Sequence, residues 1–361
     1  MKYIIKAYSI WEPGQRLDSE GNPHQEDNMF PAHEQLKDTD RLFILCDGMG
    51  GHEAGEVASA TVCDAMSKSV FESSPDAEGD FCDDNLSKAI ADAFDALDAL
   101  PLGNVSTEKK MGTTMTFLKL HSKGCTIAHM GDSRVYHIRS GKEREDTRIL
   151  FKTNDHSLVN DLIKVGELTP EEAKHSKQKN IITRAMQPNM ERHPKADVYH
   201  TTDIKPGDYF YLCSDGMLEQ MEDENLLFNF SEATGDDENK VKILTQATSQ
   251  NQDNHSAIIV HVLDVIDPLS DKDAAMVTSV NKPEPIMVEV DEDPQEDGAK
   301  DGEEKMKEGK KPEKVNFKCV NKTREDGVVI DKKRKCLKLI IYISLALIVT
   351  LLALGILFLI K

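Results

Sequence analysis

This chain of 361 residues contains two near-identical stretches, RLFILCDG (Arg41 to Gly48) and YFYLCSDG (Tyr209 to Gly216). Each is rich in apolar and aromatic residues and predicts a strand that ends at an aspartate, Asp47 or Asp215. A single Asp-Gly pair after a strand most often marks an ordinary turn, because Asp bonds its own backbone and Gly tolerates positive φ. The repeated pattern indicates instead that a carboxylate is delivered twice to the end of a strand.

Two more aspartates stand beside apolar runs, Asp27 in QEDN and Asp253 in QDNHS. If the four carboxylates cluster, they repel one another unless divalent cations neutralise them. Mg²⁺ and Mn²⁺ prefer oxygen ligands and keep several waters, so a few carboxylates and a carbonyl can hold two of them. The four aspartates therefore predict a site for Mg²⁺ or Mn²⁺.

Seven motifs lie in order between residues 1 and 264. Together they resemble the metal-dependent Ser/Thr protein phosphatases of the 2C type, the PPM family, and particularly its bacterial branch. The motifs are CDGMGGHEAGEVAS (46–59), MGTTMTFL (111–118), HMGDSRVYHI (129–138), NDHSLVNDLIKVGELTPEEA (154–173), NIITRAM (180–186), CSDGMLEQM (213–221) and QDNHSAIIVHV (252–262).

The resemblance implies a role for each matching residue. Asp47 would bridge two cations, the Gly48 carbonyl would bind one of them, and Asp215 and Asp253 would bind the other. A water acidified by the metals would attack phosphorus.

The remaining acidic residues match outer positions of the same centre. Asp132 matches a residue that, with the Asp215 position, holds a third cation. Asp27 matches a ligand, and Glu26 a residue that contacts the cations through water.

Two positions depart from the family pattern. Asn22 stands where the family usually has an arginine that contacts the substrate phosphate, and an amide cannot form the bidentate pair of a guanidinium. Either Arg16 or Arg184 substitutes, or phosphate affinity is weak, or the loop is aligned differently. Met49 stands where animal members have a histidine. His52 is nearby and is a candidate general acid, although a structural hydrogen bond is the commoner role for such a residue.

The pattern of apolar residues predicts both strands and helices. The predicted strands are 41–46, 125–130, 134–138, 209–213 and 256–262, and the predicted helices are 55–71 and 84–97. The resemblance sharpens this to an α+β fold, a β-sandwich of two antiparallel sheets flanked by helices. Residues 155–186 fall where the family has a mobile helical flap.

Composition divides the chain into three parts: a phosphatase domain at 1–264, an acidic linker at 265–336 and a membrane helix at 337–360. The net charge is −20, and residues 284–308 hold eleven acidic residues and three lysines, too polar to fold alone. A solvated spacer is the ordinary reading of that stretch, and an acidic docking segment is the alternative. Net acidity argues against nucleic acid as a partner.

Residues 339–360 carry no formal charge and include sixteen Leu, Ile, Val or Phe residues. As a helix they span roughly 33 Å, enough for a hydrocarbon core of about 30 Å. A basic cluster precedes them, whereas only Lys361 follows, so the positive-inside rule predicts a single-pass C-terminal anchor with the catalytic domain in the cytoplasm.

The sequence thus predicts a membrane-anchored, metal-dependent phosphatase that hydrolyses phosphoserine and phosphothreonine. Its expected partners are phosphoproteins, including a membrane-associated Ser/Thr kinase, and its catalytic domain is expected to be monomeric. The alternative is a pseudophosphatase that binds phosphoproteins without turnover. Asn22 favours the alternative, and the complete set of aspartates opposes it.

Overall fold

The computed structural model describes residues 1–266 apart from 16, 18–19, 51–52 and 102–110. The chain divides into two units, Met1–Cys319 and Val320–Lys361, and all described residues belong to the first. Two five-stranded antiparallel sheets form its centre. The first sheet is ordered β1 (Lys2–Glu12), β12 (His255–Ile266), β11 (Asp208–Cys213), β8 (Arg134–Arg139), β9 (Arg148–Lys152). The second is ordered β10 (Asp197–Thr201), β7 (Gly124–Met130), β6 (Met115–His121), β3 (Leu42–Cys46), β2 (Asn28–Phe30).

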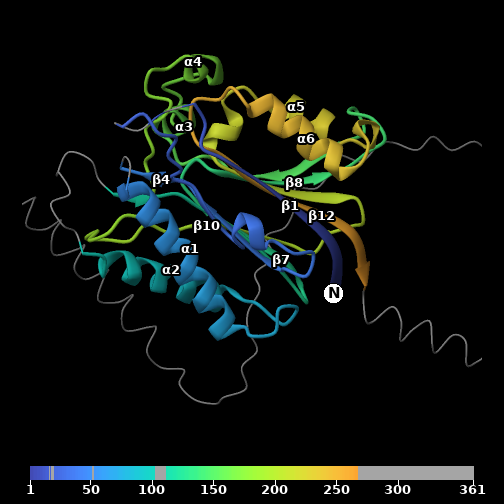
Figure 1. The fold of residues 1–361 in the computed structure, drawn as a ribbon, viewed down its shortest axis with the longest axis horizontal. Helices are drawn as coiled ribbons and strands as arrows, with labels where there is room; N and C mark the ends of the chain where they lie inside the picture. The colour runs from blue at the N-terminus through green and yellow to red at the C-terminus, as the bar shows by residue number, and fades with distance from the viewer. Residues whose placement is uncertain (16, 18–19, 51–52, 102–110, 267–361) are drawn as a thin grey trace, which may run out of the picture. The chain divides into compact units, whose positions relative to one another are not determined.

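Helices cover the outer face of each sheet (Figure 1). Helices α1 (Glu53–Ser73) and α2 (Asp83–Asp98) pack on the second sheet through a cluster that includes Met66, Phe94 and Phe117. Helices α5 (Asp223–Asn229) and α6 (Asp237–Thr248) pack on the first sheet through residues such as Phe230 and Leu244. The remaining elements are β4 (Gly48–Met49), β5 (Gly112–Thr113), α3 (Leu158–Lys164), α4 (Pro170–Lys174) and the 3₁₀ turns η1 (His33–Gln35), η2 (Asp215–Leu218) and η3 (Glu232–Thr234).

A third apolar cluster lies between the two sheets. Phe43, Leu118, Ile127, Phe210 and Ile258 are all fully buried in it, and they come from strands of both sheets. Apolar residues on both faces of a strand predict burial on both faces, and here each sheet is covered by the other sheet on one face and by helices on the other. The uniformly buried β3, β6, β7 and β11 meet this condition.

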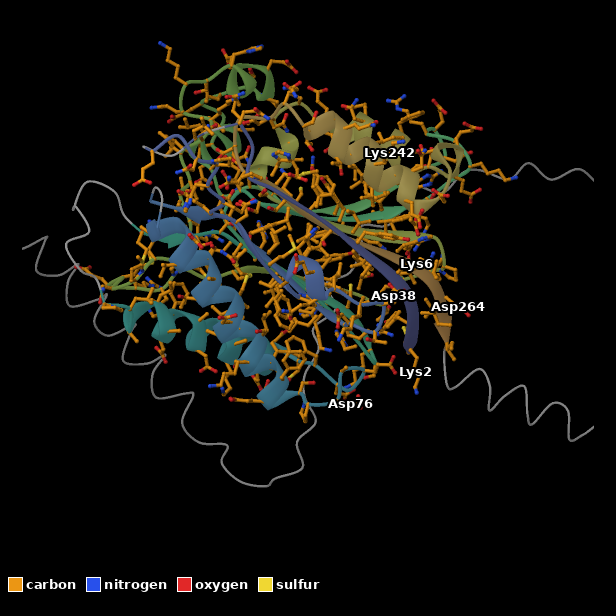
Figure 2. The ribbon with its side chains drawn as sticks, in the orientation of Figure 1. Lys2, Lys6, Asp38, Asp76, Lys242 and Asp264 are labelled. Carbon is orange, nitrogen blue, oxygen red and sulfur yellow. The ribbon has the colours of Figure 1, made fainter. Side chains whose placement is uncertain are left out.

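The predicted α+β sandwich is confirmed, and each predicted strand and helix is present within a few residues of its expected bounds. The long edge strand β1 was not predicted. It pairs with β12 in register from Lys2–Ile266 to Glu12–His255, with one irregularity, so tertiary pairing defines it. Asp38 lies beside β1 (Figure 2), where its Oδ1 accepts a hydrogen bond from the Ala7 amide at 3.0 Å.

The predicted flap is built from α3 and α4. Both helices begin at a hydroxyl cap, Ser157 and Thr169, and Pro170 starts α4. The membrane helix predicted at 337–360 and most of the predicted linker lie outside the described residues. In residues 1–266, where described, no helix is both long and apolar enough to cross a membrane.

Candidate metal centre

The strands deliver the predicted aspartates to one end of the sandwich. Asp47 follows β3, and Asp215 follows β11 after one serine. Cys213 of β11 pairs with Ala257 of β12 and with Arg134 of β8. This register places Asp253, just before β12, and Asp132, just before β8, at the same end. The antiparallel order therefore gathers residues that lie up to 226 positions apart in the sequence.

The carboxylates are close enough to raise one another's pKa. Burial, then the charges of Asp27 and Asp215, raise the pKa of Asp47 well above its usual range. Burial and Asp215 raise the pKa of Asp132 to about 8, and burial and Asp253 raise that of Asp215 to about 6. Burial raises the pKa of Asp27 to about 7 despite a hydrogen bond from a serine. Such crowding disfavours the charged forms unless cations are present.

Several observations fit a cation among these side chains. Asp27 Oδ1 and Asp132 Oδ1 are buried and have no hydrogen-bond partner among the described residues. A buried carboxylate oxygen without a partner is costly, so each is suited to bind a cation. The backbone at Gly48 is also closely approached, because a Cβ there would lie 2.3 Å from the Gly55 carbonyl oxygen and 2.5 Å from that of Glu26. Only glycine fits this position.

Buried hydroxyl groups that no sequence pattern indicated hold the backbone beside Asp47 and Asp132 in place. The Asp47 amide donates to Thr114 Oγ1 at 2.9 Å, and Thr113 Oγ1 donates to the Asp47 carbonyl oxygen at 2.9 Å. Thr114 Oγ1 also contacts Ser133 Oγ at 2.7 Å, beside Asp132. Both threonines lie in the quoted motif MGTTMTFL, but nothing in the sequence shows which backbone they bind.

Ser214 is a second unrecognised support. Its Oγ donates to Asp27 Oδ2 at 2.9 Å and accepts a hydrogen bond from the Ser256 amide at 3.0 Å. Ser214 stands between the cysteine and the Asp-Gly pair in YFYLCSDG, whereas in RLFILCDG the cysteine is followed directly by Asp-Gly, so this difference between the two stretches was a usable signal.

Of the remaining residues, one forms a structural ion pair and one lies at the surface. Arg134, the first residue of β8, forms a bidentate ion pair with Asp155, which follows the paired strand β9, and both N–O distances are 2.7 Å. Asn22 is exposed in the loop between β1 and β2. Arg16 and His52 lie outside the described residues, so the predicted general acid remains a prediction.

One further cluster has the spacing of metal ligands. Ligand atoms of His129, His156 and Asp197 lie within 4.8 Å of one another. Arg184 Nη1 lies 2.7 Å from Asp197 Oδ1 and 3.0 Å from His156 Nε2, so a guanidinium already supplies the positive charge. The Gly131 amide donates to His156 Nδ1 at 3.1 Å. His156 therefore packs and hydrogen-bonds, and the Arg184 guanidinium is engaged by Asp197 and His156.

Comparison with known proteins agrees with this geometry. A family model described as protein phosphatase 2C matches residues 14–251. Protein phosphatase PhpP of Streptococcus pneumoniae is 35% identical over 182 residues, which cover 50% of this chain and 68% of that protein. The crystal structure of the serine/threonine phosphatase PstP/Ppp of Mycobacterium tuberculosis shares 27% identity at a TM-score of 0.56, and the match covers 72% of this chain and 98% of that one.

A second structure of PstP bears on the metal. The catalytic domain of that serine/threonine protein phosphatase, in complex with two manganese ions, shares 27% identity at a TM-score of 0.55, covering 73% of this chain and all of that one. The family match, the two-sheet fold and the gathered aspartates agree with one another. The chain belongs to the PPM family of bacterial 2C-type phosphatases and is a protein serine/threonine phosphatase that acts on phosphoproteins.

Proposed function

We propose that the gathered aspartates hold two divalent cations, Mg²⁺ or Mn²⁺, and that this centre hydrolyses phosphoserine and phosphothreonine. The observation that supports it best is the pair of buried carboxylate oxygens, on Asp27 and Asp132, without a hydrogen-bond partner among the described residues. The raised pKa values of the neighbouring carboxyls support it too, because bound cations would favour the ionised forms.

Each residue would contribute a distinct contact. Asp47, held by hydroxyl groups through its backbone, would lie between the two cations, and the Gly48 carbonyl would bind one of them. Asp215 and Asp253 would bind the other, and Asp132 would join Asp215 at a third cation. Cations held there would lower the pKa of bound water and so supply the nucleophile.

Two acidic residues beside this set would complete the centre. Asp27, with Oδ2 bound by a serine hydroxyl, would offer Oδ1 as a ligand. Glu26 would contact the cations through water, and its Oε2 lies so near Gly55 that a Cβ there would come within 2.9 Å of it. Both residues lie at the start of β2, so they are carried by the same sheet as Asp47.

The proposal is tested by hydrolysis of p-nitrophenyl phosphate and of a phosphothreonine peptide with Mn²⁺, with Mg²⁺ and with EDTA. Activity should require the cation, and Asp47→Asn should abolish turnover while the protein stays folded. Asp64→Asn is the matched control, because Asp64 is exposed on α1. Wild-type turnover by Asp47→Asn would show that the metal ligands are wrongly assigned.

A pseudophosphatase is the second candidate, favoured by one observation, the neutral Asn22 in an exposed loop. It predicts binding of phosphopeptides that does not depend on Mn²⁺ and is not followed by release of phosphate. Metal-dependent phosphate release in the assay above excludes it.

We also propose that residues 337–360 anchor the enzyme in a membrane, with residues 1–264 on the cytoplasmic side. The uncharged segment 339–360 and the basic residues 332–335 before it support this topology. Membrane-associated phosphoproteins, including a Ser/Thr kinase, would then be the favoured substrates.

A further inference from the structure

The side chain of Asn254 connects three segments beside the aspartates. Its Nδ2 donates to the carbonyl oxygens of Pro13 and His24, both at 2.7 Å, and its Oδ1 accepts from the Glu26 amide at 2.9 Å. Both amide hydrogens and one lone pair are therefore used. The partners also fix the orientation of the carboxamide. If it were flipped, its oxygen would face the carbonyl oxygens of Pro13 and His24, and no hydrogen bond could form there.

These contacts hold both ends of one loop. The loop runs from Pro13 to Glu26, carries Asn22 and leads directly into Asp27. It packs so closely on the strand start that a Cβ at Gly14 would lie 2.2 Å from the Asp253 carbonyl oxygen. Gly14 has a φ of +72°, a conformation that favours glycine. The described ends of the loop, at 13–14 and 24–26, are thus held against the residues that precede β12.

Asn254 is also tied to its neighbour Asp253. Its backbone amide donates to Asp253 Oδ1 at 3.0 Å, which restricts the rotation of that carboxylate. On the other side, the Glu219 carboxylate accepts hydrogen bonds from the Gln252 amide at 2.9 Å and the Asp253 amide at 3.2 Å. Asp253 is thus held by its own neighbour and by Glu219 of the segment after η2.

We propose that Asn254 is a positioning residue of the metal centre: it holds Asp253 and the Glu26–Asp27 pair in one fixed arrangement before a cation binds. This inference rests on the proposed metal site. All three side-chain contacts of Asn254 are to protein backbone, so the role proposed for it is to position the ligands and not to bind a cation. Its effect must therefore appear in cation affinity rather than in the chemical step.

The test compares full-length wild type, Asn254→Ala, Glu219→Gln and the remote control Asn239→Ala. Asn239 also donates an amide hydrogen to a backbone carbonyl, that of Thr234, but on the α6 side of the first sheet. The dissociation constant for Mn²⁺ is measured by the electron paramagnetic resonance signal of free Mn²⁺. Turnover of p-nitrophenyl phosphate is then measured at saturating Mn²⁺, and folding is checked by circular dichroism.

For Asn254→Ala we expect a dissociation constant raised about 10- to 100-fold, the usual effect of losing a group that orients metal ligands. Glu219→Gln keeps the shape and one acceptor, so its increase should be smaller, and Asn239→Ala should match wild type. Saturating Mn²⁺ should restore kcat of Asn254→Ala to within about threefold of wild type, because the ligands themselves remain.

The outcomes separate this inference from the proposed function. Wild type that binds no Mn²⁺ overturns the metal centre and this inference together. Unchanged Mn²⁺ affinity in a folded Asn254→Ala overturns this inference alone, and so does a kcat that stays low at saturating Mn²⁺. If Asn254→Ala does not fold, Asn254→Ser decides, because serine also lacks the carboxamide that contacts Pro13, His24 and Glu26: unchanged Mn²⁺ affinity there overturns the inference.

Discussion

Asp27→Asn should stabilise the metal-free protein and weaken cation binding. Asp27 is fully buried, and one of its carboxylate oxygens has no hydrogen-bond partner among the described residues. Asparagine has the same shape and no charge, and its amide oxygen can still accept the hydrogen bond from Ser214. The substitution therefore removes a buried charge with little change in packing.

The magnitude follows from the pKa. Burial raises the pKa of Asp27 from 3.8 to about 7, and each unit corresponds to about 1.4 kcal/mol. In metal-free protein, the Asp27 carboxyl ionises near pH 4 when the chain is unfolded and near pH 7 when it is folded. Between these values unfolding releases a proton, so stability falls as pH rises, and the full cost is present above about pH 7. The upper limit is about 4 kcal/mol at pH 8, because other carboxylates share the repulsion.

The assay is urea unfolding of wild type and Asp27→Asn in EDTA at several pH values between 5 and 8. The variant should be the more stable protein, by a margin that grows with pH. With Mn²⁺ at about 100 times its dissociation constant, wild type should gain about 2.7 kcal/mol and the variant less. If wild type and Asp27→Asn had equal free energies of unfolding at both pH 5 and pH 8 in EDTA, the reasoning would be refuted.

Three further predictions concern phosphate binding, structure and topology. Asn22→Arg should lower KM for p-nitrophenyl phosphate about tenfold if the new guanidinium reaches the phosphate, since charge-assisted hydrogen bonds contribute about 1.5 to 3 kcal/mol; an unchanged KM would mean that the loop is aligned differently. Arg134→Met leaves Asp155 without its bidentate partner and should lower the free energy of unfolding by about 3 kcal/mol in urea titrations, unlike Arg144→Met at the exposed surface. Protease added to sealed, right-side-out cells should spare residues 1–264, and removal of residues 337–361 should release soluble, active enzyme; digestion without lysis would contradict the proposed orientation.

The sequence by itself predicted the strands and helices, the resemblance of its motifs to a known family predicted the two-sheet fold, and its aspartates define the candidate site. The end of a strand can be predicted from a short window of sequence, because an apolar run followed by Asp-Gly is visible within eight residues, as in RLFILCDG. The amphipathic spacing of α2 was likewise sufficient, and the observed helix Asp83–Asp98 exceeds the predicted 84–97 by one residue at each end. These features depend on short-range chemistry alone.

Only the tertiary structure decided how the aspartates are held. Ser214 donates a hydrogen bond to Asp27, 187 residues away in the sequence, and Asn254 donates one to Pro13, 241 residues away. A hydroxyl or amide in the sequence can bond to solvent, to its own backbone or to a distant chain, and only the pairing of β8, β11 and β12 determines which. The strand β1 could not be predicted for the same reason. Its partner β12 lies at the other end of the domain in sequence, and strand pairing depends on contacts that no local window contains.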